Sequence, residues 1–229
     1  MAWHKLLLED DASIAPAPNV IPIADGLGKL DGWVTPRRGL EWFKQVGTAP
    51  EVFRIAGQAN GRALSTGVPG DTRYYAMPLV SPRGGTVDML SIEVTTALAA
   101  QAIRLGIYEA TSDTDLTPGA LVVDAGIVQV NTIGVKTKTV NVSLEPDRLY
   151  YLVLQCDSPI TPNTAAIRTL DPDGAEPLLH APGTWGTMVG VGWTNDPGVH
   201  GAFQDPFPVP AVALTSAEII PAIGVRFSA

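Results

Sequence analysis

Glycine and proline interrupt this chain at short intervals, and this spacing constrains its fold more than any other feature. The 229 residues include 23 glycines and 20 prolines. From about residue 72 onward, the segments between them are rich in Val, Ile, Thr and Tyr, which suit a pleated sheet and are stiff in a helix. No amphipathic helices separate these segments, as a parallel α/β fold would require. We therefore predict an all-β fold, an antiparallel β-sandwich that is jelly-roll-like.

Alternation of apolar and polar residues predicts which face of each strand meets the core. Three segments show this period of two. The expected core residues are Asp88, Leu90, Ile92 and Val94 in the first segment, Ile103, Leu105 and Ile107 in the second, and Val140, Val142 and Leu144 in the third. The same alternation places Val87 and Met89 on the outer face of the first segment.

The first 48 residues lack this pattern. The stretch IPIADGLGKLDGWVTP carries large apolar side chains without a sustained period, and residues 39–47 are expected to form one or two helical turns. An exposed patch made of several large apolar side chains usually marks an interface. We therefore expect residues 1–48 to be an extended, irregular attachment segment ahead of a β-sandwich domain over residues 49–229. Its expected assembly interface consists of Ile21, Ile23, Leu27, Leu30, Trp33 and Trp42; the alternative is that these side chains pack on the protein's own sandwich.

Charge and cysteine content exclude several classes of partner. The net charge is -8, and no cluster of Lys or Arg offsets it, so a phosphate backbone would be repelled and nucleic acid is not expected to bind. The N-terminal stretch MAWHKLLLEDDAS resembles neither a secretory signal nor a membrane span, so we expect synthesis in the cytoplasm and no membrane insertion. Cys156 lies in an apolar run and is interpreted as a small buried hydrophobic residue.

Two parts of the sequence resemble bacteriophage tail-fibre and spike proteins. The phrase IPIADGLGKLDGWV is similar to a segment that links a virion-attached region to a distal domain in such proteins. The stretches YYAMPLVSPRGGTVDMLSIEVTT, IRLGIYEATSDTDLTPGALVVDAG and GVKTKTVNVSLEPDRLYYLVLQ resemble a jelly-roll module at the ends of such fibres. The opening stretch HKLLLEDD also resembles the beginnings of such fibres, and together the matches span most of residues 4–157. The resemblance implies a homotrimeric virion protein, released by host lysis, whose N-terminal segment docks on other virion proteins and whose β-domain faces the host surface.

Catalytic and metal-binding patterns are weak. His4, His180 and His200 have no metal-ligand spacing, so neither a metal site nor a cofactor is expected. Two Asp-x-Asp pairs, at 113/115 and 171/173, lack the further ligands of a calcium loop and are interpreted as turns held by Asx hydrogen bonds. The sequence has no Gly-x-Ser-x-Gly nucleophile motif and no β-helix repeat. We therefore expect a protein that is not an enzyme.

Residues 180–207 are the expected ligand-binding region because aromatic residues are interspersed there with Gly, Asn and Asp. Aromatic rings can stack on sugars while amide and carboxylate groups bind hydroxyls. The candidate residues are Trp185, Trp193, Asn195, Asp196, His200, Phe203 and Gln204, with Phe207 beside them. The alternative for Trp185 and Trp193 is that they fill the core or a trimer interface. The acidic net charge favours neutral or amine-bearing glycans over acidic ones.

Two classes of function follow from the sequence. The first is a virion fibre, spike or head fibre that binds a host-surface glycan, or a purely structural variant of it. The second is a soluble bacterial carbohydrate-binding module or lectin.

Overall fold

The computed structural model describes a β-rich C-terminal unit in most detail. The residues described in full are 64–80, 84–112, 115–156, 165–170, 192–214 and 219–228, and five shorter strands are described by their backbone. The chain divides into two units, Met1–Val46 and Gly47–Ala229, beside the boundary expected near residue 48. In the first unit, β1 (Ala12–Ser13) pairs in parallel with β2 (Ile21–Pro22). The helical turns expected over 39–47 and the side chains of the expected assembly interface lie outside the described residues.

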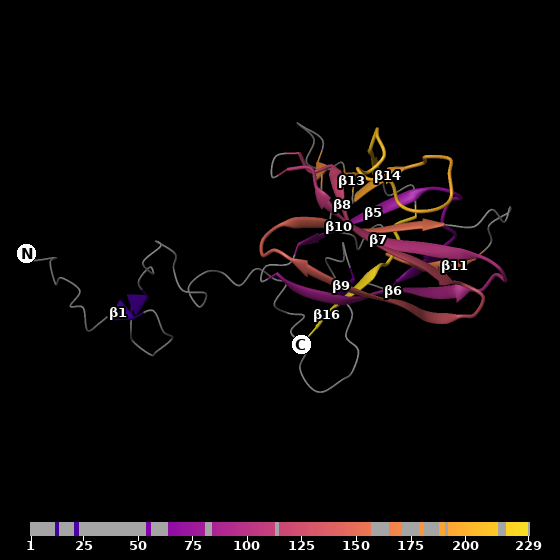
Figure 1. Cartoon of the computed structure of the whole chain (residues 1–229), viewed down its shortest axis with the longest axis horizontal. Coiled ribbons are helices and arrows are strands. Elements are labelled where there is room, and N and C mark those ends of the chain that lie inside the picture. The colour runs from indigo at the N-terminus through magenta and orange to yellow at the C-terminus, as the bar shows by residue number, and fades with distance from the viewer. Residues whose placement is uncertain are drawn as a thin grey trace, which may run out of the picture. The chain divides into compact units, whose positions relative to one another are not determined.

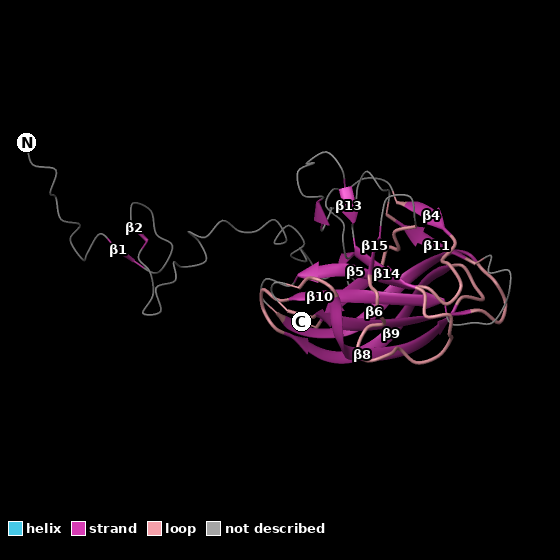
Figure 2. Cartoon of the chain, turned by 90° about the horizontal axis from the view of Figure 1, so that it is seen from above, coloured by secondary structure: helices cyan, strands magenta, loops and turns pink. Residues whose placement is uncertain are grey.

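Two antiparallel sheets form most of the second unit (Figure 1). The first, here called the β10 sheet, has six strands in the order β15 (Val212–Leu214), β14 (Gly192–Asn195), β5 (Tyr74–Val80), β10 (Leu149–Cys156), β7 (Ala102–Ala110) and β8 (Pro118–Gln129). Strands make up most of the described residues in this unit, and no helix is among them (Figure 2). Accordingly, this described part contains no helix with the length and apolar character needed to cross a bilayer.

The second sheet is arranged around its long central strand and is here called the β6 sheet. One edge of β6 (Gly85–Thr96) pairs with β9 (Gly134–Leu144), and its other edge pairs in succession with β16 (Gly224–Phe227) and β11 (Ala166–Thr169). The outer strands are β3 (Arg54–Ile55) beside β16 and β4 (Ser65–Gly67) beside β11. A separate pair consists of β12 (Leu179–His180) and β13 (Met188–Gly190). Consecutive strands β8 and β9 belong to different sheets, so the chain passes from one layer to the other there.

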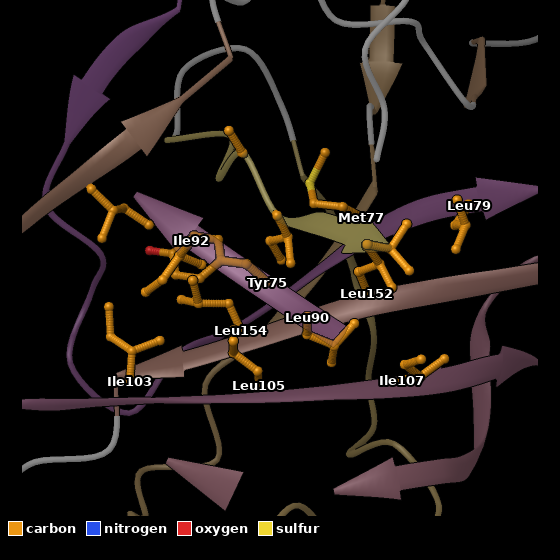
Figure 3. Packing of buried hydrophobic residues seen from close by; sticks show 14 of the residues in the cluster. Tyr75, Met77, Leu79, Leu90, Ile92, Ile103, Leu105, Ile107, Leu152 and Leu154 are labelled. Atoms are coloured by element: carbon orange, nitrogen blue, oxygen red, sulfur yellow. The ribbon is translucent and has the colours of Figure 1, made fainter. Parts of the chain in front are cut away.

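The core lies between the two sheets, as the sequence predicts. Side chains from β5, β7 and β10 meet those of β6 in one buried cluster (Figure 3). Ile103, Leu105 and Ile107 of β7 are confirmed as core residues. Val140, Val142 and Leu144 of β9 face the same cluster, as expected. The predicted all-β class and the jelly-roll-like antiparallel β-sandwich are therefore confirmed. Cys156 is fully buried, and its Sγ accepts a hydrogen bond from Gln101 Nε2 at 3.0 Å.

The predicted alternation in β6 is wrong at its start. The register of β6 shifts between Val87 and Met89, so Val87 is fully buried and Asp88 points out of the core. The Asp88 carboxylate instead accepts two hydrogen bonds from the Arg226 guanidinium, at 2.9 and 3.0 Å. A bulge of this kind inserts one residue and reverses the faces beyond it. It avoids burying a carboxylate in the apolar core, where an unpaired charge is costly.

Because of the bulge, we expect truncation of Val87 and of Met89 to lower the free energy of unfolding by different amounts. Simple alternation would place both side chains on the same outer face and predict similar, small losses. We expect Val87→Ala to lower the free energy of unfolding by about 2 kcal/mol, because it leaves a cavity in the core. Met89→Ala removes more atoms but from a partly exposed side chain, so we expect a loss of less than about 1 kcal/mol. Equilibrium urea unfolding of the full chain measures both. Equal losses would contradict the observed register.

Candidate functional site

The outer face of the β10 sheet carries three buried tyrosines. Tyr74 of β5, Tyr151 of β10 and Tyr108 of β7 have at most 1% of their surface exposed, although they point away from the main core. The segment that covers them is the connection between β14 and β15, residues 196–211, here called the strap. A second, smaller apolar cluster therefore lies between the strap and the sheet.

Two strap phenylalanines pack against the tyrosines edge to face. The ring centroids of Phe203 and Phe207 lie 5.1 and 5.7 Å from that of Tyr74 and 5.9 and 5.3 Å from that of Tyr108. All four interplanar angles lie between 73° and 85°. Edge-to-face contacts at this range are the preferred aromatic geometry and add to the stabilisation from burial.

One carboxylate on the sheet and one on the strap hold the strap against the sheet. Asp124 Oδ2 accepts the backbone N–H of Phe203 at 3.1 Å, and the same carboxylate is held by Arg104 Nη1 at 2.9 and 3.0 Å. In return, Asp205 Oδ1 accepts the backbone N–H of Leu121 at 3.0 Å. Hydrogen bonds to charged groups are stronger than neutral ones, so these contacts set the position of the strap on β8.

The start of the strap is held by a buried amide. Gln155 of β10 donates from Nε2 to the carbonyl oxygens of Thr72 and Val199, at 3.1 and 2.6 Å. Asp196 Oδ1 accepts the hydroxyl of Thr72 at 2.6 Å. Both ends of the strap are therefore bound to the same sheet.

The expectation that Phe203 offers a stacking surface for a sugar is wrong, and the same holds for Phe207. Only 6% of Phe203 and 2% of Phe207 are exposed, because both rings fill the apolar cluster under the strap. The physical reason for their burial is that the tyrosine-rich face of the sheet would otherwise be exposed to water.

Trp193 is half-buried against the same cluster. Its indole Nε1–H donates to the carbonyl of Leu116 at 2.8 Å and lies 3.2 Å from the hydroxyl of Tyr151. The interpretation that Trp193 is a packing residue therefore accounts for its contacts. Trp185, the other predicted tryptophan, lies outside the described residues.

The polar candidates also make contacts within the protein. Asn195 Nδ2 donates to the carbonyl of Pro210 at 2.8 Å. His200 Nδ1 lies 3.3 Å from the carbonyl of Cys156, and its Nε2 lies 3.5 Å from Asp71 Oδ1. The backbone N–H of Gln204 donates to the Tyr74 hydroxyl at 3.3 Å, while its side chain is exposed. The six predicted residues that the structure describes therefore all lie in the strap or on β14, which leads into it, mostly as anchors.

An open groove lies beside the strap. Its volume is about 460 Å³, and it runs between the β7–β8 connection and the last part of the strap. Glu109, Thr111, Asp115 and Thr117 contribute polar groups on one side. Pro206, Val209 and neighbouring strap residues contribute apolar surface on the other. Concave sites with apolar walls and a few convergent polar groups are typical of ligand binding.

Hydrogen bonds fix the polar side of the groove. Asp115 Oδ1 accepts both the backbone N–H and the hydroxyl of Thr117, at 3.1 and 2.7 Å, and the Thr111 and Thr117 hydroxyl oxygens lie 3.1 Å apart. These bonds to Thr117 hold the pKa of Asp115 below its usual range. The Glu109 carboxylate lies 3.2 Å from Arg148 Nη2.

The sequence does not predict this groove, and only one of its features, the turn at Asp115, is expected from it. The prediction of an Asx turn is confirmed for Asp115, which accepts the N–H of the residue two positions later. Asp113, Asp171 and Asp173 lie outside the described residues. Nothing in the sequence shows that the segment around Asp115 faces the strap, because the two are about 90 residues apart along the chain and are brought together only by the fold, where the backbone N–H of Phe207 donates to the carbonyl of Gly119 at 2.8 Å.

Comparisons with known proteins identify no relative. No protein-family model matches this chain, and no curated protein or solved structure matches it either. Within the described residues, there is no group of three or more His, Cys, Asp or Glu side chains that could hold a metal ion.

The strap predicts a strict requirement for glycine at position 106. A Cβ at Gly106 would lie 2.7 Å from Phe203 Cε2 and 2.7 Å from the carbonyl oxygen of Val123. Because the backbone cannot yield easily, we expect Gly106→Ala to cost about 1–3 kcal/mol in unfolding free energy. It should also speed hydrogen exchange at the Phe203 and Gln204 amides, which hydrogen-exchange mass spectrometry can follow. Thr137→Ala, at an exposed position of β9, serves as the control and should change neither; unchanged exchange in Gly106→Ala would contradict the close packing of the strap.

Proposed function

We propose that this chain is a non-enzymatic bacteriophage virion protein, a tail fibre, spike or head fibre, whose β-sandwich binds a glycan of the host surface in the groove beside the strap. It assembles as a homotrimer through its N-terminal segment, which also docks on other virion proteins. The virion component of the proposal rests on the sequence resemblance of residues 4–157. The glycan component rests on the groove.

The groove is the observation that carries the binding proposal. Hydroxyl and carboxylate groups on one side and apolar strap residues on the other suit a sugar ring, which has polar edges and apolar C–H faces. The strap is held by aromatic packing and by charged hydrogen bonds, so the groove exists before a ligand arrives. A preformed site spends little binding energy on ordering its own residues.

The state of the two groove carboxylates favours binding over hydrolysis. A glycoside hydrolase needs one carboxyl group with a raised pKa to act as general acid. Here the pKa of Asp115 is lowered by its hydrogen bonds to Thr117, and Glu109 is ion-paired with Arg148. The environment of Asp115 is therefore the opposite of the one that a general acid needs.

The alternative is a soluble bacterial carbohydrate-binding module, which would use the same groove without a virion. The two proposals differ in assembly. A fibre presents several copies of its distal domain, whereas a soluble module can act alone.

Assembly state is therefore the first measurement. We expect light scattering on a sizing column to give a mass close to three times the 24.1 kDa of one chain. Deleting residues 1–48 should leave a folded β-domain that runs as a monomer, as circular dichroism and the same column would show. A truncated protein that stayed trimeric would contradict assembly through the N-terminal segment, and a monomeric full chain would favour the soluble module.

Glycan binding is tested by a substitution on the apolar wall of the groove. Val209 is 85% exposed, so Val209→Gln should leave the melting temperature unchanged. We expect it to weaken binding to an array of bacterial surface glycans, because an uncharged polar amide replaces the apolar surface that faces the sugar. Val212→Gln is the matched control, since Val212 is also exposed but lies outside the groove. Equal binding by both variants would exclude the groove as the site.

A further inference from the structure

The groove has an uneven charge. Glu109 and Asp115 line it, and none of its described lining residues is a lysine or an arginine. Arg148 neutralises Glu109 from outside the lining and also pairs with Glu145 at 3.1 Å. Asp115 is therefore the carboxylate of the groove whose described contacts include no cation.

The Asp115 carboxylate is also held in place. Thr117 donates two hydrogen bonds to its Oδ1. These bonds favour the ionised form and fix the orientation of the carboxylate, while the side chain stays exposed to an incoming group. Such a group would gain most if it were a cationic donor, because charge-assisted hydrogen bonds are stronger than neutral ones.

The opposite wall can accommodate an apolar surface of the same ligand. Val209 and Pro206 belong to the strap, whose position is set by its contacts with the sheet. A ligand that satisfies both walls carries an ammonium group on a ring with apolar C–H faces. An acidic sugar would be repelled by Asp115.

We propose that the groove selects a sugar with a free amino group, whose ammonium binds Asp115 while a face of the ring packs on Val209 and Pro206. This inference rests on the proposed glycan-binding function and deepens it. It distinguishes an amine-bearing glycan from a neutral one, which the net charge of the chain alone does not. Acetylation of the amine removes the charge and should remove the preference.

The test compares two ligands that differ only in this group. An oligomer of glucosamine and its fully N-acetylated counterpart of equal length are titrated into the full-length protein at low and at physiological salt. We expect the amine form to bind about fivefold more tightly at low salt, the upper range for an exposed ion pair. Calorimetry measures both affinities. The difference should shrink as salt increases, because ions screen exposed charges.

Isosteric substitutions give the control. Asp115→Asn keeps the acceptor for Thr117 but removes the charge, so it should abolish the preference for the amine form. Asp147→Asn makes the same charge change in an exposed turn outside the groove lining and should retain it. An amine preference that survives Asp115→Asn would reflect general attraction to an acidic protein and overturn the inference.

Two further outcomes separate this inference from the proposed function. If both oligomers bind equally and Val209→Gln weakens both, amine selection is overturned while glycan binding in the groove stands. If neither oligomer binds, the inference is again overturned, and the glycan array alone decides the proposed function.

Discussion

Burial of both faces of the β10 sheet is the constraint on which this structure depends. An antiparallel sheet commonly packs one face on the core and leaves the other to water. Here β5, β10 and β7 carry large side chains on both faces, with Leu152 and Leu154 toward the β6 sheet and Tyr151 and Val153 away from it. The outer face therefore needs its own cover, and the strap provides it.

Tyrosine suits this second interface because its ring can be buried while its hydroxyl binds the covering backbone. Tyr108 donates to the carbonyl of Gln204 in the strap, and Tyr151 donates to the carbonyl of Leu116 in the β7–β8 connection. Burial raises the pKa of both hydroxyls far above the usual value, so both remain protonated donors. The two segments that border the groove are thus attached to neighbouring strands of one sheet, which fixes their separation.

The sequence predicts the sheet architecture well because strand alternation and Gly/Pro turns are local signals. It fails where a non-local contact decides the outcome. At the bulge beside Val87, the partner of Asp88 is Arg226, which lies far along the chain. Phe203 looks like an exposed loop aromatic until its tyrosine partners are known. The mixture of aromatic residues with Gly, Asn and Asp therefore sets the strap apart from the strands. It does not show whether a given aromatic residue anchors the strap or binds a ligand.

The shape of the groove has a consequence for the proposed fibre. An open groove with solvent-exposed walls covers only part of a sugar ring, so a single site should bind weakly. In a trimer, the three grooves are tied together, and the second and third binding events become intramolecular. The surface of a bacterium repeats its glycans densely, so weak single sites suffice for tight attachment. Under this proposal, the value of the rigid strap is that it keeps each groove formed, while assembly supplies the affinity.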